Sequence, residues 1–415
     1  MRSEPDPPRV YVWMWLPGAT EPVVAGVLEA DGAVTSFNYG KTFLEREDAV
    51  PIYLPELPLQ SGRIRPIAGL SVAGCIADAA PDAWGQRVIL HRISRGQPSE
   101  SFHPYPHLFT FLLESGSDRF GALDFQESPT NYTPRSVSAT LEEMMRAVER
   151  LEAGEPFSPE LDAALLRGSS IGGARPKALL DDGDRKLIAK FSSSSDPYPV
   201  VKAEAVAMEL ARRVGIDAAW TQVVECLGRD VLLVERFDRT GVPGVRLMVV
   251  SALTILGLDE MAARYATYHA LADAIRERFV RPKETLRELF SRIVFNICVG
   301  NTDDHARNHA AFWDGSNLTL TPAYDVCPQL RSGGEALQAM AIDRDGFRLS
   351  QLAGCVAASQ TYLLARTEAR AIIDHQLSTI NSQWEEAADA ARLTDAERSQ
   401  LWGRQILNSF ATAGY

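Results

Sequence analysis

The sequence lacks the features that mark several specialised classes of protein. Its five cysteines are scattered and include no C-x-x-C pair, so neither a disulfide framework nor a thiolate zinc site is predicted. No apolar run approaches the roughly 18 residues of a membrane-spanning helix, and the first residues do not form a signal peptide. We therefore expect a cytoplasmic protein without membrane contact, in which the cysteines stay reduced.

Positive charge is also scarce. The 42 lysines and arginines are outnumbered by 54 aspartates and glutamates, and the formal net charge is −12. This balance argues against a broad electrostatic surface for nucleic acid. The hydrophobic content of 46% is ordinary for a globular protein, and 415 residues are enough for two or three packed units.

The hydrophobic pattern predicts a sheet-rich first half and a helical second half, which is an α+β architecture. Strands are predicted at residues 10–16, 23–28, 34–39, 186–191, 231–234 and 318–320. Helices are predicted at residues 141–153, 200–214, 268–279, 283–299, 357–374 and 394–411. Loop signals divide the chain into a β-rich subdomain, a lobe with a Gly-rich loop and a helical lobe, at residues 1–128, 129–240 and 241–415.

A polar cluster follows the helix predicted at 283–299, which Gly300 can end. It contains Asp303 and Asn308, and a second carboxylate, Asp325, follows the strand predicted at 318–320. Oxygen ligands of this kind suit Mg²⁺ with a polyphosphate. Protein kinases have a catalytic Asp, an Asn five residues later and a metal-binding Asp further on, and these three residues reproduce that order. The alternative is a solvated turn with an Asn cap.

A Gly-rich segment lies upstream, where backbone N–H groups can approach phosphate oxygens closely. It contains Ser169, Ser170, Ile171, Gly172 and Gly173. On the strand that follows, Lys190 lies opposite the apolar face, where kinases keep a phosphate-binding lysine. Glu204, at the margin of the next helix's apolar stripe, is the acid best placed to pair with Lys190. Alternatively, the segment is a plain turn and both charged residues lie on the surface.

A further segment, after the apolar strand at 231–234, consists of Glu235, Arg236 and Phe237 and leads into a loop with two glycines and a proline. We interpret this segment as a connection between lobes, where backbone groups are positioned to contact adenine.

These segments together resemble the HipA family of bacterial toxin kinases. The resemblance rests on residues 170–177, 234–239, 301–308 and 324–325, and on 81–85 and 118–123 near the N-terminus. It implies a protein-kinase-like bilobal fold, with a sheet-rich N-terminal lobe, an extra N-terminal subdomain and an all-helical C-terminal lobe. It also implies a serine/threonine-protein kinase that uses ATP and Mg²⁺.

The resemblance assigns roles to the candidate residues. Asp303 becomes the catalytic residue, Asn308 and Asp325 the Mg²⁺ ligands, and Lys190 the phosphate-binding lysine, while residues 235–237 contact adenine. His305 is expected beside the nucleotide, ordering the catalytic loop by hydrogen bonding. Members of the family autophosphorylate a serine of the Gly-rich loop, which matches Ser170, although Ser169 stands beside it. Arg175 replaces the Gln often found in this loop.

The implied partners are a HipB-like helix-turn-helix antitoxin and a protein substrate, with an aminoacyl-tRNA synthetase as the expected target. DNA contact is expected only through the antitoxin. Two alternatives stay open. One is a metal-dependent phosphohydrolase that uses His305 and His309 as imidazole ligands. The other is a catalytically silent HipA-like corepressor.

Overall fold

The computed structural model describes residues 9–94, 108–136, 139–153, 155, 170, 173, 175–193, 196–331 and 333–415. The chain forms two compact units and passes between them more than once. Unit 1 comprises Met1–Phe191, Asp238–Val250 and Trp313–Ser316, and unit 2 comprises Ser192–Phe237, Ser251–Phe312 and Asn317–Tyr415. The three-part division at residues 128 and 240 stays a prediction.

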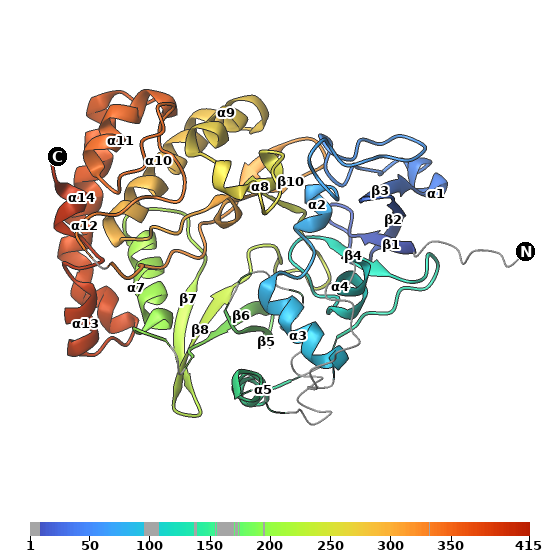
Figure 1. Ribbon diagram of the computed structural model, residues 1–415, viewed down its shortest axis with the longest axis horizontal. Helices are drawn as coiled ribbons and strands as arrows, with labels where there is room; N and C mark the ends of the chain where they lie inside the picture. The colour runs from blue at the N-terminus through green and yellow to red at the C-terminus, as the bar shows by residue number, and fades with distance from the viewer. Residues whose placement is uncertain are drawn as a thin grey trace, which may run out of the picture. The chain divides into compact units, whose positions relative to one another are not determined.

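Unit 1 contains a four-stranded sheet with the strand order β3-β2-β1-β4 (Figure 1). Its strands are β1 (Arg9–Met14), β2 (Val23–Asp31), β3 (Val34–Tyr39) and β4 (Leu123–Gln126). β1 pairs antiparallel with both β2 and β4, and the predicted hairpin between β2 and β3 is confirmed. Gly32 in its turn has a φ of 67°, which a residue without a Cβ adopts at little cost.

Unit 1 also contains several helices and one further hairpin. The helices are α1 (Lys41–Leu44), α2 (Gly74–Ala77), α3 (Ala83–Ser94), α4 (Leu108–Glu114) and α5 (Leu141–Ala153). The hairpin pairs β5 (Lys177–Asp182) with β6 (Arg185–Phe191). Along β6, Leu187, Ala189 and Phe191 are buried while Lys190 is half-buried, so the predicted alternation is confirmed.

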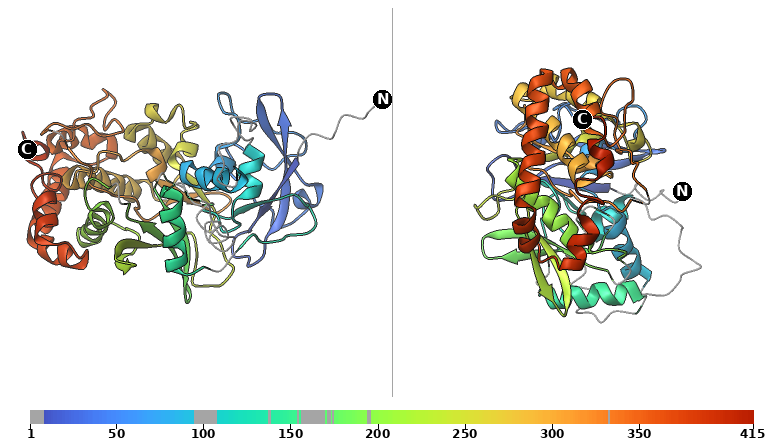
Figure 2. Two further views of the ribbon diagram at one scale, coloured as in Figure 1. Left: turned by 60° about the horizontal axis from the view of Figure 1, so that its bottom comes forward. Right: turned by 90° about the vertical axis from the view of Figure 1, so that its left-hand side faces the viewer.

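Unit 2 is mainly helical. Its helices are α7 (Val200–Arg213), α8 (Ala252–Ile255), α9 (Tyr268–Arg278), α10 (Pro282–Val299), α11 (Leu352–Ala358), α12 (Arg366–Ala390), α13 (Asp395–Leu401) and α14 (Ser409–Thr412). Three 3₁₀ turns, η1 (Ala263–Tyr265), η2 (Ala306–Asn308) and η3 (Ser359–Tyr362), and the hairpin of β7 (Thr221–Cys226) with β8 (Arg229–Glu235) accompany them. The long helix α12 packs along α7 (Figure 2).

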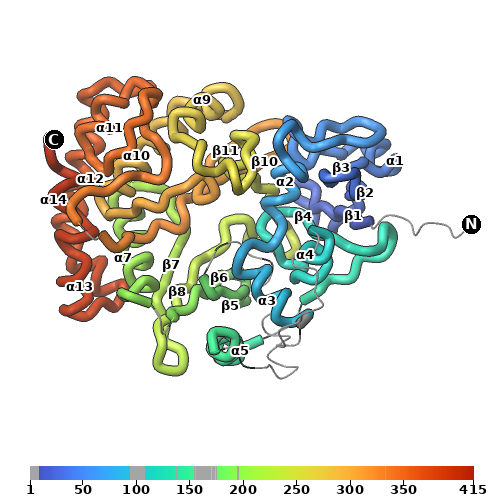
Figure 3. Tube along the Cα trace, viewed as in Figure 1, coloured from blue at the N-terminus to red at the C-terminus, as the bar shows by residue number. Residues whose placement is uncertain are grey.

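Three further short strands follow β8 in the chain. β9 (Val249–Ser251), β10 (Ala310–Trp313) and β11 (Leu318–Leu320) form a sheet in the order β11-β10-β9, and Figure 3 shows β10 beside β11. The strand predicted at 318–320 is therefore confirmed. The C-terminal half is mainly helical, as expected, but not purely so.

Two predicted helices are wrong because each is interrupted. The helix predicted at 357–374 is divided after η3, where Leu363 has a φ of 57°. The helix predicted at 394–411 is divided after Leu401, and Gly403 and Leu407 there have φ values of 72° and 49°. A left-handed residue reverses the chain at a helix end, and apolar spacing alone does not reveal it.

Helix α10 carries the polar loop of interest and lies in the core of unit 2. Pro282 stands in its first turn, where a missing N–H costs nothing. Leu289 and Phe290 are fully buried, and each such side chain contributes about 1.5–3 kcal/mol of hydrophobic stabilisation. The helix ends at Gly300, whose φ is 71°. A Cβ there would lie 2.6 Å from the carbonyl oxygen of Gln405, so both conformation and space require glycine.

Candidate functional site

The loop after α10 brings Asp303 and Asn308 together. The backbone N–H of Asn308 donates to the carbonyl of His305 at 2.9 Å, which forms the turn of η2. The side-chain amide of Asn308 donates to the carbonyl of Asp303 at 3.4 Å. The two residues that the sequence placed five positions apart therefore belong to one compact loop.

Asp325 is joined to this loop through its neighbour Tyr324. The Tyr324 hydroxyl donates to the carbonyl of Arg307 at 2.7 Å, which connects the segment of Asp325 to the residue before Asn308. Asp325 itself has a φ of 60°, a conformation that Asp tolerates better than most residues. The sequence pattern did not reveal this connection, since Tyr324 and Arg307 lie 17 residues apart.

The electrostatic environment of Asp303 includes the neighbouring carboxylates. The side chain of Asp303 is exposed. Its pKa is nevertheless raised, because the surrounding protein partly desolvates the carboxyl and because the charges of Asp325 and Asp304 lie nearby, while His305 acts in the opposite direction. Two carboxylates that repel each other at an open surface favour a bound cation or a proton.

Asp304 has the opposite environment, since it is only 3% exposed. Its Oδ2 accepts hydrogen bonds from the Tyr268 hydroxyl at 2.5 Å, the Asn296 amide at 2.8 Å and His309 Nε2 at 2.8 Å. Asn301 in turn donates to the Asn296 side chain at 2.9 Å. We call these five side chains the Asp304 cluster.

The donors of this cluster keep Asp304 ionised. Burial by itself would raise the pKa of Asp304, but the charge of His309 and the hydrogen bonds from His309 and Tyr268 outweigh it, so the pKa is lowered. Burial, and then the charge of Asp304, hold the pKa of Tyr268 well above its usual value. Since an ionised carboxylate only accepts, Nε2 of His309 must carry the proton that it donates.

A small cavity of about 10 Å³ adjoins the cluster and is lined by Asn296, Asp304, Asn308, His309 and Tyr324, among others. This volume is close to the smallest that can hold one water molecule. The Nδ1 atom of His309 is buried and has no hydrogen-bond partner among the described residues. A single water molecule therefore fits this space.

The predicted adenine segment lies at the end of β8. Glu235 donates its backbone N–H to Trp220, and Arg236 is buried. The ring of Phe237 lies 5.4 Å from the ring of Tyr324 and 5.9 Å from the ring of Phe312. Thus the segment contacts the residue that precedes Asp325.

The remaining predicted residues divide between the two units. Glu204 lies on α7 of unit 2 and is buried, while Lys190 lies on β6 of unit 1, so their pairing stays a prediction. The Nδ1 atom of His305 is buried and finds no hydrogen-bond partner in the described part of the chain, and the ordering role of His305 stays a prediction. Ser169, Ile171 and Gly172 lie outside the described residues.

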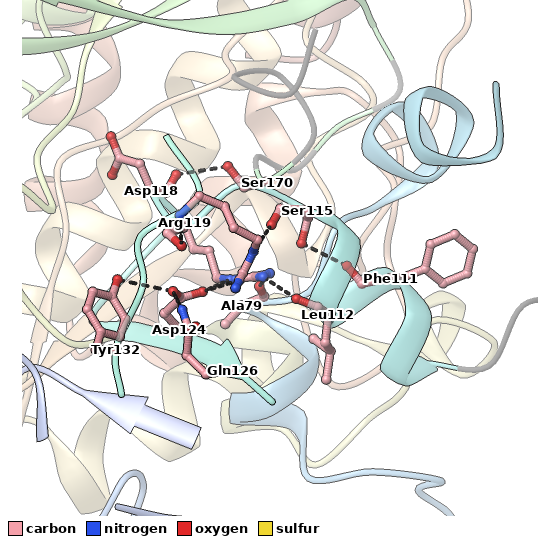
Figure 4. A network of polar contacts seen from close by, with 12 residues as sticks. Ala79, Phe111, Leu112, Ser115, Asp118, Arg119, Asp124, Gln126, Tyr132 and Ser170 are labelled. Atoms are coloured by element: carbon pink, nitrogen blue, oxygen red, sulfur yellow. Dashed lines mark hydrogen bonds and ion pairs between the residues drawn. The ribbon is translucent and has the colours of Figure 1, made fainter. Parts of the chain in front are cut away.

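The described part of the Gly-rich segment is held by the two N-terminal segments 81–85 and 118–123. All of these residues belong to unit 1. The Ser170 hydroxyl donates to the carbonyl of Asp118 at 2.9 Å (Figure 4), and Ser170 is only 3% exposed. On the other side, the backbone N–H of Trp84 donates to Gly173 at 3.2 Å and its indole N–H donates to Lys177 at 3.0 Å. Sequence reasoning found both motifs but not this function for them.

A buried ion-pair network fixes the Asp118 segment. Arg119 is fully buried, and its Nε donates to Asp124 at 2.9 Å (Figure 4). Asp124 also accepts from Arg135 at 2.9 Å and from the Tyr132 hydroxyl at 3.1 Å. Burial opposes ionisation, but the charges of Arg119 and Arg135 outweigh it and lower the pKa of Asp124.

Comparison with known proteins identifies the family. The model of the HipA-like C-terminal domain matches residues 169–384, and that of the HipA N-terminal domain matches residues 17–126. The chain belongs to the HipA family. It is thus a member of a kinase toxin family, and the resemblance predicted from the sequence is confirmed.

Individual relatives agree with this assignment. The chain is 25% identical to the putative kinase Y4mE of Sinorhizobium fredii, over 70% of this chain and 71% of that protein. It is 28% identical to the serine/threonine-protein kinase toxin HipA of Shewanella oneidensis, over 42% of this chain and 46% of that protein. These relatives are named as kinases.

A solved structure supports the fold. The solved complex of Shewanella oneidensis HipA, HipB and operator DNA contains a chain that matches with a TM-score of 0.65 and 20% identity, over 96% of this chain and 99% of that one. The predicted HipA-like α+β fold is therefore confirmed. Within the described residues, no helix combines the length and apolar character required to cross a bilayer.

Proposed function

We propose that this chain is an ATP-dependent serine/threonine-protein kinase that transfers the γ-phosphoryl group to a protein hydroxyl. The observation that carries the proposal is the gathering of Asp303, Asn308 and Asp325 on joined loops of unit 2, in a chain of the HipA family. Asp303 aligns the substrate hydroxyl and accepts its proton, and its raised pKa suits a base.

The residues fit Mg²⁺ as the metal. Asn308 and Asp325 would hold the ion, since Mg²⁺ is usually bound by one or two carboxylates together with phosphate oxygens. Among the residues that the structure describes, no group of three or more His, Cys, Asp or Glu side chains could hold a metal by itself, which agrees with a site completed by the nucleotide. Bound Mg²⁺ offsets charge on the transferred phosphate.

The other candidate residues act on the nucleotide. Lys190 orients the phosphates and pairs with Glu204, the backbone of residues 235–237 contacts adenine, and His305 orders the loop beside it. Since the transferred group needs little covalent help from the protein, most of the rate comes from positioning and electrostatic stabilisation.

The phosphohydrolase alternative is less well supported. It needs His305 and His309 as ligands of a transition metal. His309 is buried and donates its Nε2 proton to Asp304, so this nitrogen is already engaged. The arrangement therefore favours the kinase.

The biological role follows from the family. The solved relative assembles with HipB and operator DNA, so we infer a HipB-like antitoxin as partner of this chain and DNA contact only through that antitoxin. The inferred target is an aminoacyl-tRNA synthetase in the cytoplasm, whose phosphorylation inhibits translation and arrests growth, leading to persistence. Autophosphorylation at Ser170 silences the enzyme, and it requires the bond from Ser170 to Asp118 to break first.

Incubation of the purified chain with labelled ATP and Mg²⁺ tests the activity. Wild type should incorporate phosphate into itself, and Asp303→Ala should not. Asp345→Ala, at an exposed position, is the matched control and should behave as wild type. Equal incorporation by wild type and Asp303→Ala would refute the role of Asp303.

The substrate is found by quantitative phosphoproteomics after brief expression of wild type and of Asp325→Ala in parallel. Sites phosphorylated only with wild type identify the targets, and tRNA synthetases are expected among them. If no phosphorylation site differs between the two, those of the chain itself included, the silent corepressor becomes the better interpretation.

A further inference from the structure

The Asp304 cluster has a feature that ordinary core packing does not require. The side chains of Asp304 and His309 are joined to each other at 2.8 Å, and each directly follows a residue of the candidate active site, Asp303 and Asn308. The pair thus closes a short loop through its side chains. It also fastens that loop to α9 through Tyr268 and to α10 through Asn296.

We propose that Asp304 and His309 are positioning residues that set the separation of Asp303 and Asn308 before nucleotide binds. This inference rests on the proposed kinase function and deepens it. Neither residue touches the substrate, because both are almost completely buried.

Three observations support a positioning role over a merely structural one. All three donors converge on a single oxygen, Oδ2 of Asp304, so one atom fixes the loop to two helices. Among the described residues, the backbone between the two anchors is tied by the Asn308 N–H to His305, by the Asn308 amide to Asp303 and by the Tyr324 hydroxyl to Arg307, and none of these bonds reaches α9 or α10. Among the residues that the structure describes, the exposed carboxylate of Asp303 has no comparable set of donors, so its position depends on its neighbour.

The expected effect on kcat is large for substitution of a residue that does not touch the substrate. Displacement of a reacting group by about 1 Å can cost on the order of a hundredfold in rate. If His309 no longer holds Asp304, we expect kcat to fall about ten- to hundredfold. The Mg²⁺ concentration for half-maximal activity should rise, since Asn308 moves with His309, while ATP binding without Mg²⁺ should stay unchanged.

The decisive comparison uses two substitutions at one position. His309→Leu removes the donor, while His309→Gln keeps an N–H of similar reach. His375→Gln, on the exposed face of α12, is the matched control for the chemical change. For each variant, kcat and Mg²⁺ dependence are measured by phosphate incorporation, and hydrogen exchange of residues 302–308 is measured without nucleotide.

The inference is supported if His309→Leu lowers kcat by at least tenfold and accelerates hydrogen exchange in the loop. His309→Gln should then restore most of the wild-type kcat and most of the wild-type protection from exchange. Wild-type values of kcat and exchange in His309→Leu overturn the inference. If the wild-type protein itself transfers no phosphate, the proposed function fails separately, and the exchange of the loop alone decides whether the pair holds it. Should His309→Leu not fold, Tyr268→Phe, which removes one hydroxyl, carries the same two measurements, and unchanged values there overturn the inference.

Discussion

Gly300 offers the sharpest test of how the structure holds the candidate active site in place. It ends α10 in the left-handed region, with a φ of 71°, and the polar loop begins at the next residue. A residue with a Cβ loses about 1–2 kcal/mol in this conformation. The new Cβ of Gly300→Ala would also lie 2.6 Å from the Gln405 carbonyl oxygen, and overpacking of this kind costs about 1–3 kcal/mol.

Gly215 separates the two contributions. It follows α7, has a φ of 88°, and has no heavy atom within 4 Å of the position of an added Cβ. Gly215→Ala should therefore lose only the conformational part, about 1–2 kcal/mol. Gly300→Ala should lose about 2–5 kcal/mol, because the contact with Gln405 is added to it.

Urea denaturation followed by tryptophan fluorescence measures both free energies of unfolding, and an unchanged slope shows that stability alone has changed. Gly300→Ala should also lower phosphate incorporation, because the contact displaces the start of the loop that carries Asp303. Gly215→Ala should not. Equal losses of stability in the two variants would show that the Gln405 contact does not constrain this loop.

Two further predictions concern carboxylates with shifted pKa values. Asp124→Asn leaves Arg119 buried without its counter-charge and should cost about 3 kcal/mol at neutral pH, whereas Asp48→Asn, in an exposed pair, should cost far less. Since the pKa of Asp124 is lowered, its contribution to the free energy of unfolding is present above about pH 4 and is lost as the pH falls. In urea titrations, the difference in free energy of unfolding between wild type and Asp124→Asn should therefore become smaller in acid. For Asp303 the pKa is raised, so the effect on stability has the opposite sign. The negative charge of Asp303 costs stability above its folded-state pKa. Asp303→Asn should therefore raise the melting temperature of the nucleotide-free protein at pH 7 but not below about pH 4. A lower melting temperature at pH 7 would contradict that reasoning.

The sequence predicted the parts of the site that are local in the chain. Asp303 and Asn308 share one short loop, and the strand before Asp325 is marked by its own apolar residues. Gly300 was expected to end the helix because glycine is favoured there, and it does. Each of these features depends on neighbours within a few positions, which a periodic pattern can reveal.

Features that depend on distant segments could not be predicted in this way. Tyr268 reaches Asp304 across 36 positions, and Ser170 reaches Asp118 across 52. The interrupted helices have the same origin, since Leu363 adopts a left-handed conformation that its own preferences disfavour and that tertiary packing must stabilise. Apolar spacing continues across such a break and so conceals it.

The neighbouring residues Asp303 and Asp304 show how the fold assigns different roles to one residue type. Asp304 is buried, and the charge of His309 together with the donors on its Oδ2 lowers its pKa. Asp303 is exposed, and partial desolvation together with the charges of Asp325 and Asp304 raises its pKa, so it gains most from a cation or a proton. A side chain that is fully satisfied stabilises a loop, and one that is left unsatisfied is available for chemistry. Within the described part of the chain, Asp304 thus fixes the loop to two helices, while the neighbouring Asp303 presents its carboxylate at the surface.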